Sequence, residues 1–157
     1  MPKFKNIAVV GVGLIGASLA SALKKYQPEI KITGVDSCAE SIEKAEALGI
    51  IDQGFEKIGT NLKKSELIFI AVPVAAIPAV IKEIDQGSDK KQLLVDLGST
   101  KKEIMLQAKK ILTESSKEFI GGDPMAGSHK SGVEWRDSEL FKGAPFILTP
   151  WLENDKG

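Results

Sequence analysis

The sequence predicts an α/β fold, a doubly wound and mostly parallel sheet with helices on both faces. Short apolar runs alternate along the chain with segments of helical periodicity, which is the pattern of successive βαβ units. A glycine-rich turn also stands between the first apolar run and the first helical segment. With 157 residues, the chain is long enough to bury a core of its own as one domain.

A change of periodicity defines the first βαβ unit. Residues 7–10 are all apolar, which suits a strand buried on both faces. Residues 14–26 repeat their apolar positions at helical spacing, and Lys24 and Lys25 lie in the last turn, where they complement the helix dipole. Residues 31–36 are the second expected strand.

The later elements continue this alternation. In one of the expected helices Pro78 falls in the first turn, where its missing N–H costs no hydrogen bond. Gly49 is a signal for the end of another helix. The expected elements are a helix at 39–48, a strand at 66–72, a helix at 75–84, a strand at 92–97, a helix at 100–112, a strand at 118–120 and, after a glycine-containing loop, a strand at 145–149.

Composition excludes several classes of protein. Lys plus Arg and Asp plus Glu number 21 each, so no net charge draws the chain to nucleic acid or to an anionic membrane. Cys38 is the only cysteine, which excludes an internal disulfide and a cysteine-based metal site, and we predict no metal. With no signal peptide or transmembrane segment visible, a cytoplasmic location is expected.

The expected domain covers residues 1–150. The tail that follows is polar, apart from Trp151 and Leu152, and has little to pack on. We therefore expect residues 151–157 to begin a linker to a second, C-terminal domain that the sequence does not include.

The glycine turn predicts a dinucleotide site of the Rossmann type. Gly11 permits the tight turn, Gly13 lets a pyrophosphate approach the backbone, and Gly16 lets the helix pack on the sheet. Leu14 and Ile15 complete the first turn of that helix, whose N-terminal amides favour an anion. Such a motif is weak alone, but here it has a strand before it and a helix after it.

Asp36 distinguishes between the two nicotinamide cofactors. It lies at the end of the second strand, 20 positions after Gly16, as expected for a residue that binds the adenosine ribose. Its carboxylate accepts hydrogen bonds from ribose hydroxyls and repels a 2′-phosphate, so the sequence predicts NAD rather than NADP. The alternative is a solvated aspartate at a strand end.

Three further segments are candidates for the site. Val72 and Pro73 end a strand and can offer apolar surface and backbone amides to the cofactor, although simple packing explains them equally well. Ser99 lies at a strand-to-helix turn where the nicotinamide is expected, but it or Thr100 could instead be a helix N-cap. His129, the only histidine, lies in the polar loop 121–132, where it is a possible catalytic group or a surface residue.

Four segments of the chain form a distinctive combination: GVGLIGASLA at 11–20, VDLGSTK at 95–101, GGDPMAGSHKSG at 121–132 and FILTP at 146–150. In this order they resemble the prephenate dehydrogenase family. The resemblance covers essentially the whole chain and implies a nicotinamide-dependent oxidative decarboxylation of prephenate to 4-hydroxyphenylpyruvate, the precursor of tyrosine. It also implies a second, helical domain that forms a homodimer and completes the substrate pocket.

The resemblance assigns roles to three residues. Ser99 matches a family serine that hydrogen-bonds near the substrate hydroxyl and the nicotinamide. Asp123 stands where the family loop usually has a histidine that accepts the hydroxyl proton. An aspartate, with an unperturbed pKa of about 3.9, is a poor base near neutral pH, and its charge repels a substrate with two carboxylates. His129 lies six residues further on and is the other candidate base.

Three alternatives remain open at this point. The substrate could be arogenate, which differs from prephenate in an amine that the absent domain would recognise. The chain could bind NAD with impaired catalysis because of Asp123. It could also belong to another NAD-dependent dehydrogenase that acts on a small hydroxy acid, although the two later motifs disfavour that reading.

Overall fold

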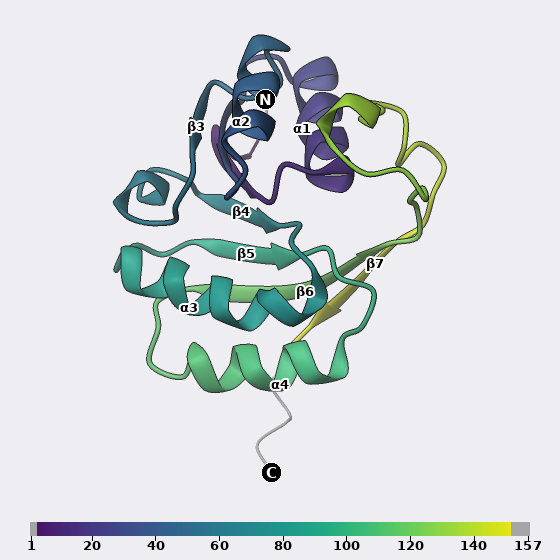
Figure 1. Ribbon diagram of the computed structural model, residues 1–157. Coiled ribbons are helices and arrows are strands. Elements are labelled where there is room, and N and C mark those ends of the chain that lie inside the picture. The colour runs from purple at the N-terminus through teal and green to yellow at the C-terminus, as the bar shows by residue number, and fades with distance from the viewer. Residues whose placement is uncertain (1–2, 152–157) are drawn as a thin grey trace.

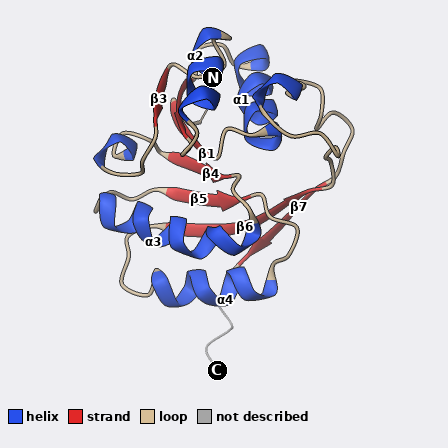
Figure 2. Ribbon diagram, viewed as in Figure 1, coloured by secondary structure: helices blue, strands red, loops and turns tan. Residues whose placement is uncertain are grey.

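The computed structural model describes residues 3–151 and confirms the alternation of strands and helices. Within this range seven strands form a single sheet in the order β3-β2-β1-β4-β5-β6-β7, with helices on both sides of it (Figure 2). The elements are β1 (Asn6–Val10), α1 (Leu14–Tyr26), β2 (Lys31–Val35), α2 (Ala39–Ala47), β3 (Gln53–Phe55), η1 (Thr60–Leu62), β4 (Leu67–Ile70), η2 (Val74–Ala76), α3 (Ile77–Gly87), β5 (Leu93–Asp96), α4 (Lys102–Ile111), β6 (Glu118–Pro124), η3 (Val133–Trp135) and β7 (Phe146–Pro150).

The order of the strands creates a switch point beside β1. Strands β1 to β6 are parallel, and only β7 runs antiparallel to its neighbour β6. The chain builds outward from β1 to β2 and β3, then returns to the other side of β1 to form β4. In open α/β sheets, ligands bind beyond the carboxyl ends of the strands at such a reversal.

Alternate residues of β1 divide the core into two layers. Ile7 and Val9 join one buried cluster with residues of α1 and α2, whereas Ala8 and Val10 join the other with residues of α3 and α4. This follows from the period of two in a strand, which sends successive side chains to opposite faces. Figure 1 shows the two helix pairs on either side, α1 with α2 at the top and α3 with α4 at the bottom.

Two strands differ from the expected pattern. Strand β3 was not expected, because a three-residue segment with a central glycine is a weak strand signal. Gly54 is needed there since a Cβ atom would lie 2.2 Å from Cγ2 of Ile42, which α2 packs against the strand. Strand β6 extends to Pro124 rather than ending at Ile120, because its second half pairs with β7. Asp123 therefore lies in a strand and not in a loop.

The helix ends agree with several sequence signals and contradict one. Gly49 adopts a left-handed conformation (φ +67°) just beyond α2, and Pro78 lies in the first turn of α3. Helix α4, however, begins at Lys102, and its N-cap Lys101 makes no side-chain cap hydrogen bond. The reading of Ser99 or Thr100 as an N-cap is therefore wrong, because both residues precede the cap.

The C-terminal side of the domain ends on the α4 face. Trp151 packs against Phe119 with ring centroids 6.0 Å apart. The rest of the predicted linker, residues 152–157, lies outside the described residues. Within residues 3–151, no helix is long and apolar enough to cross a membrane.

Glu139 ties the long segment between β6 and β7 to helix α1. Its carboxylate accepts hydrogen bonds from the Tyr26 hydroxyl at 2.6 Å and from the Lys25 ammonium, and it also pairs with Lys142. These donors lower the pKa of Glu139 to about 2, from 4.5. These hydrogen bonds and ion pairs require the charged carboxylate, so their contribution to stability is present above pH 4.5 and is lost as the pH falls toward 2.

We expect Glu139→Gln to lower the free energy of unfolding above pH 4.5 and to have no effect near pH 2. Urea unfolding of both proteins at a series of pH values measures the difference. Glu114→Gln, at an exposed position after α4, is the matched control. A difference that does not change with pH would contradict the charged contact.

Candidate functional site

The glycine turn between β1 and α1 fits only because two of its residues lack a side chain. Gly11 has φ +92°, a conformation that favours glycine, and a Cβ atom there would lie 2.4 Å from the carbonyl oxygen of Ala71. A Cβ atom on Gly16 would lie 1.9 Å from the carbonyl oxygen of Gly11. The turn is fixed to β2 by the Gly11 N–H, which donates to the carbonyl oxygen of Val35 at 2.7 Å.

Gly13 is different, because a Cβ atom added to it would meet no atom within 4 Å. It is the N-cap of α1, so the open space lies in front of the free amides of the first helical turn. Such amides, with the partial positive charge of the helix N-terminus, are suited to a phosphate group. Gly11 and Gly16 are therefore required by the close approach of backbone atoms, whereas the space at Gly13 leaves its predicted role in pyrophosphate access open to test.

Asp36 is held by the same turn. One of its carboxylate oxygens accepts the Val12 N–H at 2.8 Å, and the other accepts the Cys38 N–H at 2.8 Å. A carboxylate has about four acceptor positions, so both oxygens can still accept hydrogen bonds from a ligand. Asp36 thus couples the end of β2 to the turn after β1, in addition to the ligand role predicted for it.

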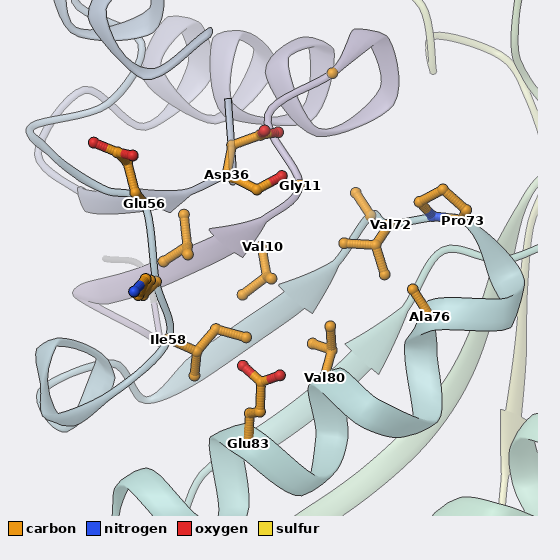
Figure 3. Close-up of a pocket in the computed structure, with 15 residues that line it drawn as sticks. Val10, Gly11, Asp36, Glu56, Ile58, Val72, Pro73, Ala76, Val80 and Glu83 are labelled. Atoms are coloured by element: carbon orange, nitrogen blue, oxygen red, sulfur yellow. The ribbon is translucent and has the colours of Figure 1, made fainter. Parts of the chain in front are cut away.

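A cavity of about 690 Å³ opens at the carboxyl ends of β1 to β4. The residue that follows each of these four strands lines the cavity, and α3 forms the opposite wall. Figure 3 shows Asp36 beside Gly11 on the strand side and Val80 of α3 across the cavity from them. A cavity of this size can enclose a large part of a dinucleotide. The lining residues are Val10, Gly11, Gly13, Val35, Asp36, Ser37, Glu56, Lys57, Ile58, Ala71, Val72, Pro73, Ala76, Val80 and Glu83.

Five of the predicted cofactor residues line the cavity: Gly11, Gly13, Asp36, Val72 and Pro73. The other four, Leu14, Ile15, Gly16 and Ser99, are not among the lining residues. Leu14 and Gly16 are buried in the first turn of α1, and Ile15 is half-buried there. Ser99 is exposed in the turn after β5 and is not among the lining residues.

Sequence reasoning missed the wall formed by β3 and α3. Glu56 follows β3, a strand that was not expected, and Glu83 lies on α3. A signal for the α3 part was available, since Ala76, Val80 and Glu83 recur at helical spacing beside the buried stripe of that helix. Among the described lining residues, three carboxylates face one ammonium group, that of Lys57, and this balance disfavours an additional phosphate.

The three predicted catalytic residues lie in or after β5 and β6, toward the same edge of the sheet. Ser99 is exposed in the turn between β5 and α4, and Asp123 is half-buried near the end of β6. Because β5 and β6 are parallel neighbours, their carboxyl ends meet at one edge. His129 is exposed in the segment after β6. The structure thus places Ser99 in the turn after β5 and Asp123 in the adjacent strand β6, and no hydrogen bond joins His129 to either residue within the described part of the chain.

Comparison with known proteins decides the family. The model of the prephenate dehydrogenase nucleotide-binding domain matches residues 19–157. The chain belongs to the prephenate dehydrogenase family. It is 39% identical to prephenate dehydrogenase of Bacillus subtilis over 152 residues, which is 96% of this chain and 41% of that protein. It is 42% identical to prephenate dehydrogenase of Lactococcus lactis over 147 residues, which is 92% of this chain and 41% of that protein.

The fold agrees with the same family. The structure of Aquifex aeolicus prephenate dehydrogenase in complex with hydroxyphenyl propionate and NAD+ superposes with a TM-score of 0.87 at 34% identity, covering 99% of this chain and 54% of that chain. The predictions of a Rossmann-type nucleotide-binding domain and of NAD as its cofactor are confirmed at the level of the family. The chain spans about two fifths of the length of the curated relatives that it matches.

The Asp36 carboxylate gives a direct test of cofactor preference. We expect Asp36→Asn to raise the Kd for NAD about tenfold, because a hydrogen bond to a charged acceptor contributes about 1.5–3 kcal/mol and 1.4 kcal/mol is a factor of ten. We also expect the preference for NAD over NADP to shrink, since the repelling charge is gone. Calorimetric titration with both cofactors measures this, and Asp89→Asn, at an exposed position far along the chain, is the control. Tighter binding of NADP than of NAD by the unaltered protein would contradict the role of Asp36.

Proposed function

We propose that this chain is the cofactor-binding domain of an NAD-dependent prephenate dehydrogenase, which converts prephenate to 4-hydroxyphenylpyruvate in tyrosine biosynthesis. The observation that supports this most strongly is the family match, together with a cavity at the switch point whose lining includes Gly13 and Asp36. The open space at Gly13 and the carboxylate of Asp36 fit the pyrophosphate and the adenosine ribose of NAD. When bound, NAD supplies the nicotinamide that accepts the hydride.

The residues of this chain bind the cofactor and orient the substrate. Gly11, Gly13 and Asp36 hold the cofactor, while Val72 and Pro73 provide apolar surface that excludes water on the nicotinamide side. Ser99 hydrogen-bonds the hydroxyl of the substrate ring and orients it. Loss of that hydroxyl proton, loss of the hydride from the same carbon and release of carbon dioxide leave an aromatic ring.

Asp123 is the proposed proton acceptor, with His129 as the alternative. Asp123 lies near the end of β6, beside the strand that leads to Ser99. Carboxylates are in general weaker proton acceptors near neutral pH than imidazoles. A second candidate function follows from this residue, namely a domain that binds NAD but catalyses slowly because Asp123 replaces a histidine.

The active site proposed here needs a second domain. We propose that the full-length protein carries a helical domain after residue 151, which forms a homodimer and completes the substrate pocket. We expect the 157-residue chain alone to bind NAD without appreciable NADH formation.

The deciding experiment measures NADH formation by the full-length protein with prephenate and with arogenate side by side. Turnover of prephenate supports the proposal, and preference for arogenate would change the substrate but not the reaction. NAD binding with no turnover of either substrate would favour the impaired domain. Turnover by the isolated chain would contradict the need for a second domain.

A further inference from the structure

A buried carboxylate with no role in the site described so far joins the two segments that hold Ser99 and Asp123. Asp96 is the last residue of β5 and has no exposed surface. One of its oxygens accepts the Gly98 N–H at 2.9 Å and also pairs with the ammonium group of Lys101. The other oxygen accepts the Gly122 N–H at 3.2 Å.

The partners of Asp96 lie on either side of Ser99 and next to Asp123. Gly98 and Lys101 stand on either side of Ser99 and Thr100, so one carboxylate oxygen fixes both ends of the turn that carries Ser99. Gly122 directly precedes Asp123, so the other oxygen fixes the backbone of β6 beside that residue. The same side chain therefore sets the position of the turn and of the strand end relative to each other.

The surroundings leave this carboxylate little freedom to move. A Cβ atom on Gly122 would lie 2.5 Å from the backbone carbonyl oxygen of Asp96, so the strands approach closely at this point. The Lys101 side chain is only 16% exposed, and its pairing with Asp96 is shielded from water. Hydrogen bonds to a carboxylate are stronger than those between neutral groups, and surroundings without water strengthen them further.

We propose that Asp96, with its partner Lys101, is a positioning residue for the dehydrogenase reaction, holding Ser99 and Asp123 in register across β5 and β6. This rests on the proposed function, in which Ser99 orients the substrate hydroxyl and Asp123 accepts its proton. Asp96 itself is buried and does not line the cofactor cavity, so it acts through the residues that it holds. Because catalytic groups must be held to within about 0.5 Å, loosening this carboxylate affects turnover more than cofactor binding.

The test compares Asp96→Asn with Asp89→Asn in the full-length protein. Asparagine has nearly the same shape, but it loses the charge that holds Lys101 and one of the oxygen acceptors. We expect kcat with prephenate to fall about 100-fold, as for a misplacement of about 1 Å, while the Kd for NAD is unchanged because the cofactor cavity does not include Asp96. Asp89→Asn leaves both quantities unchanged.

Lys101→Met and Lys102→Met form a second matched pair. Lys101 pairs with Asp96, whereas Lys102 is an exposed neighbour at the start of α4. We expect Lys101→Met to reproduce the loss of kcat at constant Kd for NAD, and Lys102→Met to behave as the unaltered protein. Equal effects at both lysines would assign the loss to the surface charge of α4 and overturn the pairing with Asp96.

Amide hydrogen exchange separates this inference from the proposed function. In Asp96→Asn we expect faster exchange confined to residues 98–101 and 121–123, with the rest of the domain unchanged. Unchanged exchange in these segments, an unchanged kcat, or a loss of protection throughout the domain together with weaker NAD binding would overturn the positioning role. If the unaltered protein forms no NADH from prephenate, the proposed function fails, and the exchange of these two segments alone decides whether Asp96 holds them together.

Discussion

We expect Asp123→His to raise kcat of the full-length protein with prephenate by about 10²- to 10⁴-fold, the range that a well-placed general base contributes. The reason is the proton affinity of the acceptor, because an imidazole is in general a better proton acceptor near neutral pH than a carboxylate. The substitution also removes the negative charge of Asp123, which repels a substrate with two carboxylates. Steady-state NADH formation measures the change.

The pH profile shows whether the new histidine is the base. A histidine accepts a proton only in its neutral form, so kcat/KM of Asp123→His should fall as the pH drops below about 6.5. Asp89→His, at an exposed position, controls for the introduction of a histidine as such. If Asp123→His leaves kcat unchanged and His129→Ala abolishes turnover, then His129 is the base and Asp123 is not.

Several residues that line the cavity were predictable as site residues because they lie at strand ends that local sequence defines. Gly11, Gly13 and Asp36 follow the first two strands, and the cavity includes all three. Glu56 and Glu83 could not be found in the same way. Glu56 follows a three-residue strand whose stability comes from pairing with β2 rather than from its own residues, and Glu83 faces the cavity only because α3 packs across the end of the sheet.

The catalytic side of the site depends on contacts that sequence does not reveal. The VDLGSTK segment pointed to Ser99, with the helix N-cap as the alternative role of Ser99 or Thr100, whereas Asp96 in the same segment is the residue that the fold buries. Its hydrogen bond with Gly122 joins positions 26 residues apart, and this contact exists only because β6 pairs beside β5. Likewise, the extension of β6 to Pro124 follows from pairing with β7, which lies far along the chain.

Gly16→Ala and Gly13→Ala separate what the glycine turn does for folding from what it does for NAD. At Gly16 a Cβ atom would lie 1.9 Å from the backbone carbonyl oxygen of Gly11 and 3.0 Å from Cγ1 of Val9. Backbone cannot yield as a flexible side chain does, so α1 must move off the sheet. We expect Gly16→Ala to lower the free energy of unfolding by about 3 kcal/mol, the upper part of the range for overpacking, and to weaken NAD binding with it.

At Gly13 the same substitution meets no atom within 4 Å, and the backbone (φ −81°) suits alanine. The methyl group instead enters the space in front of the first turn of α1, where the pyrophosphate must approach the amides. Gly13→Ala should therefore unfold at the same urea concentration as the unaltered chain and yet bind NAD more weakly. Urea unfolding and calorimetric titration of both variants test this pair. If Gly13→Ala bound NAD as tightly as the unaltered protein, the phosphates would have to lie elsewhere than at the N-terminus of α1, because a methyl group at that position leaves no room for them there.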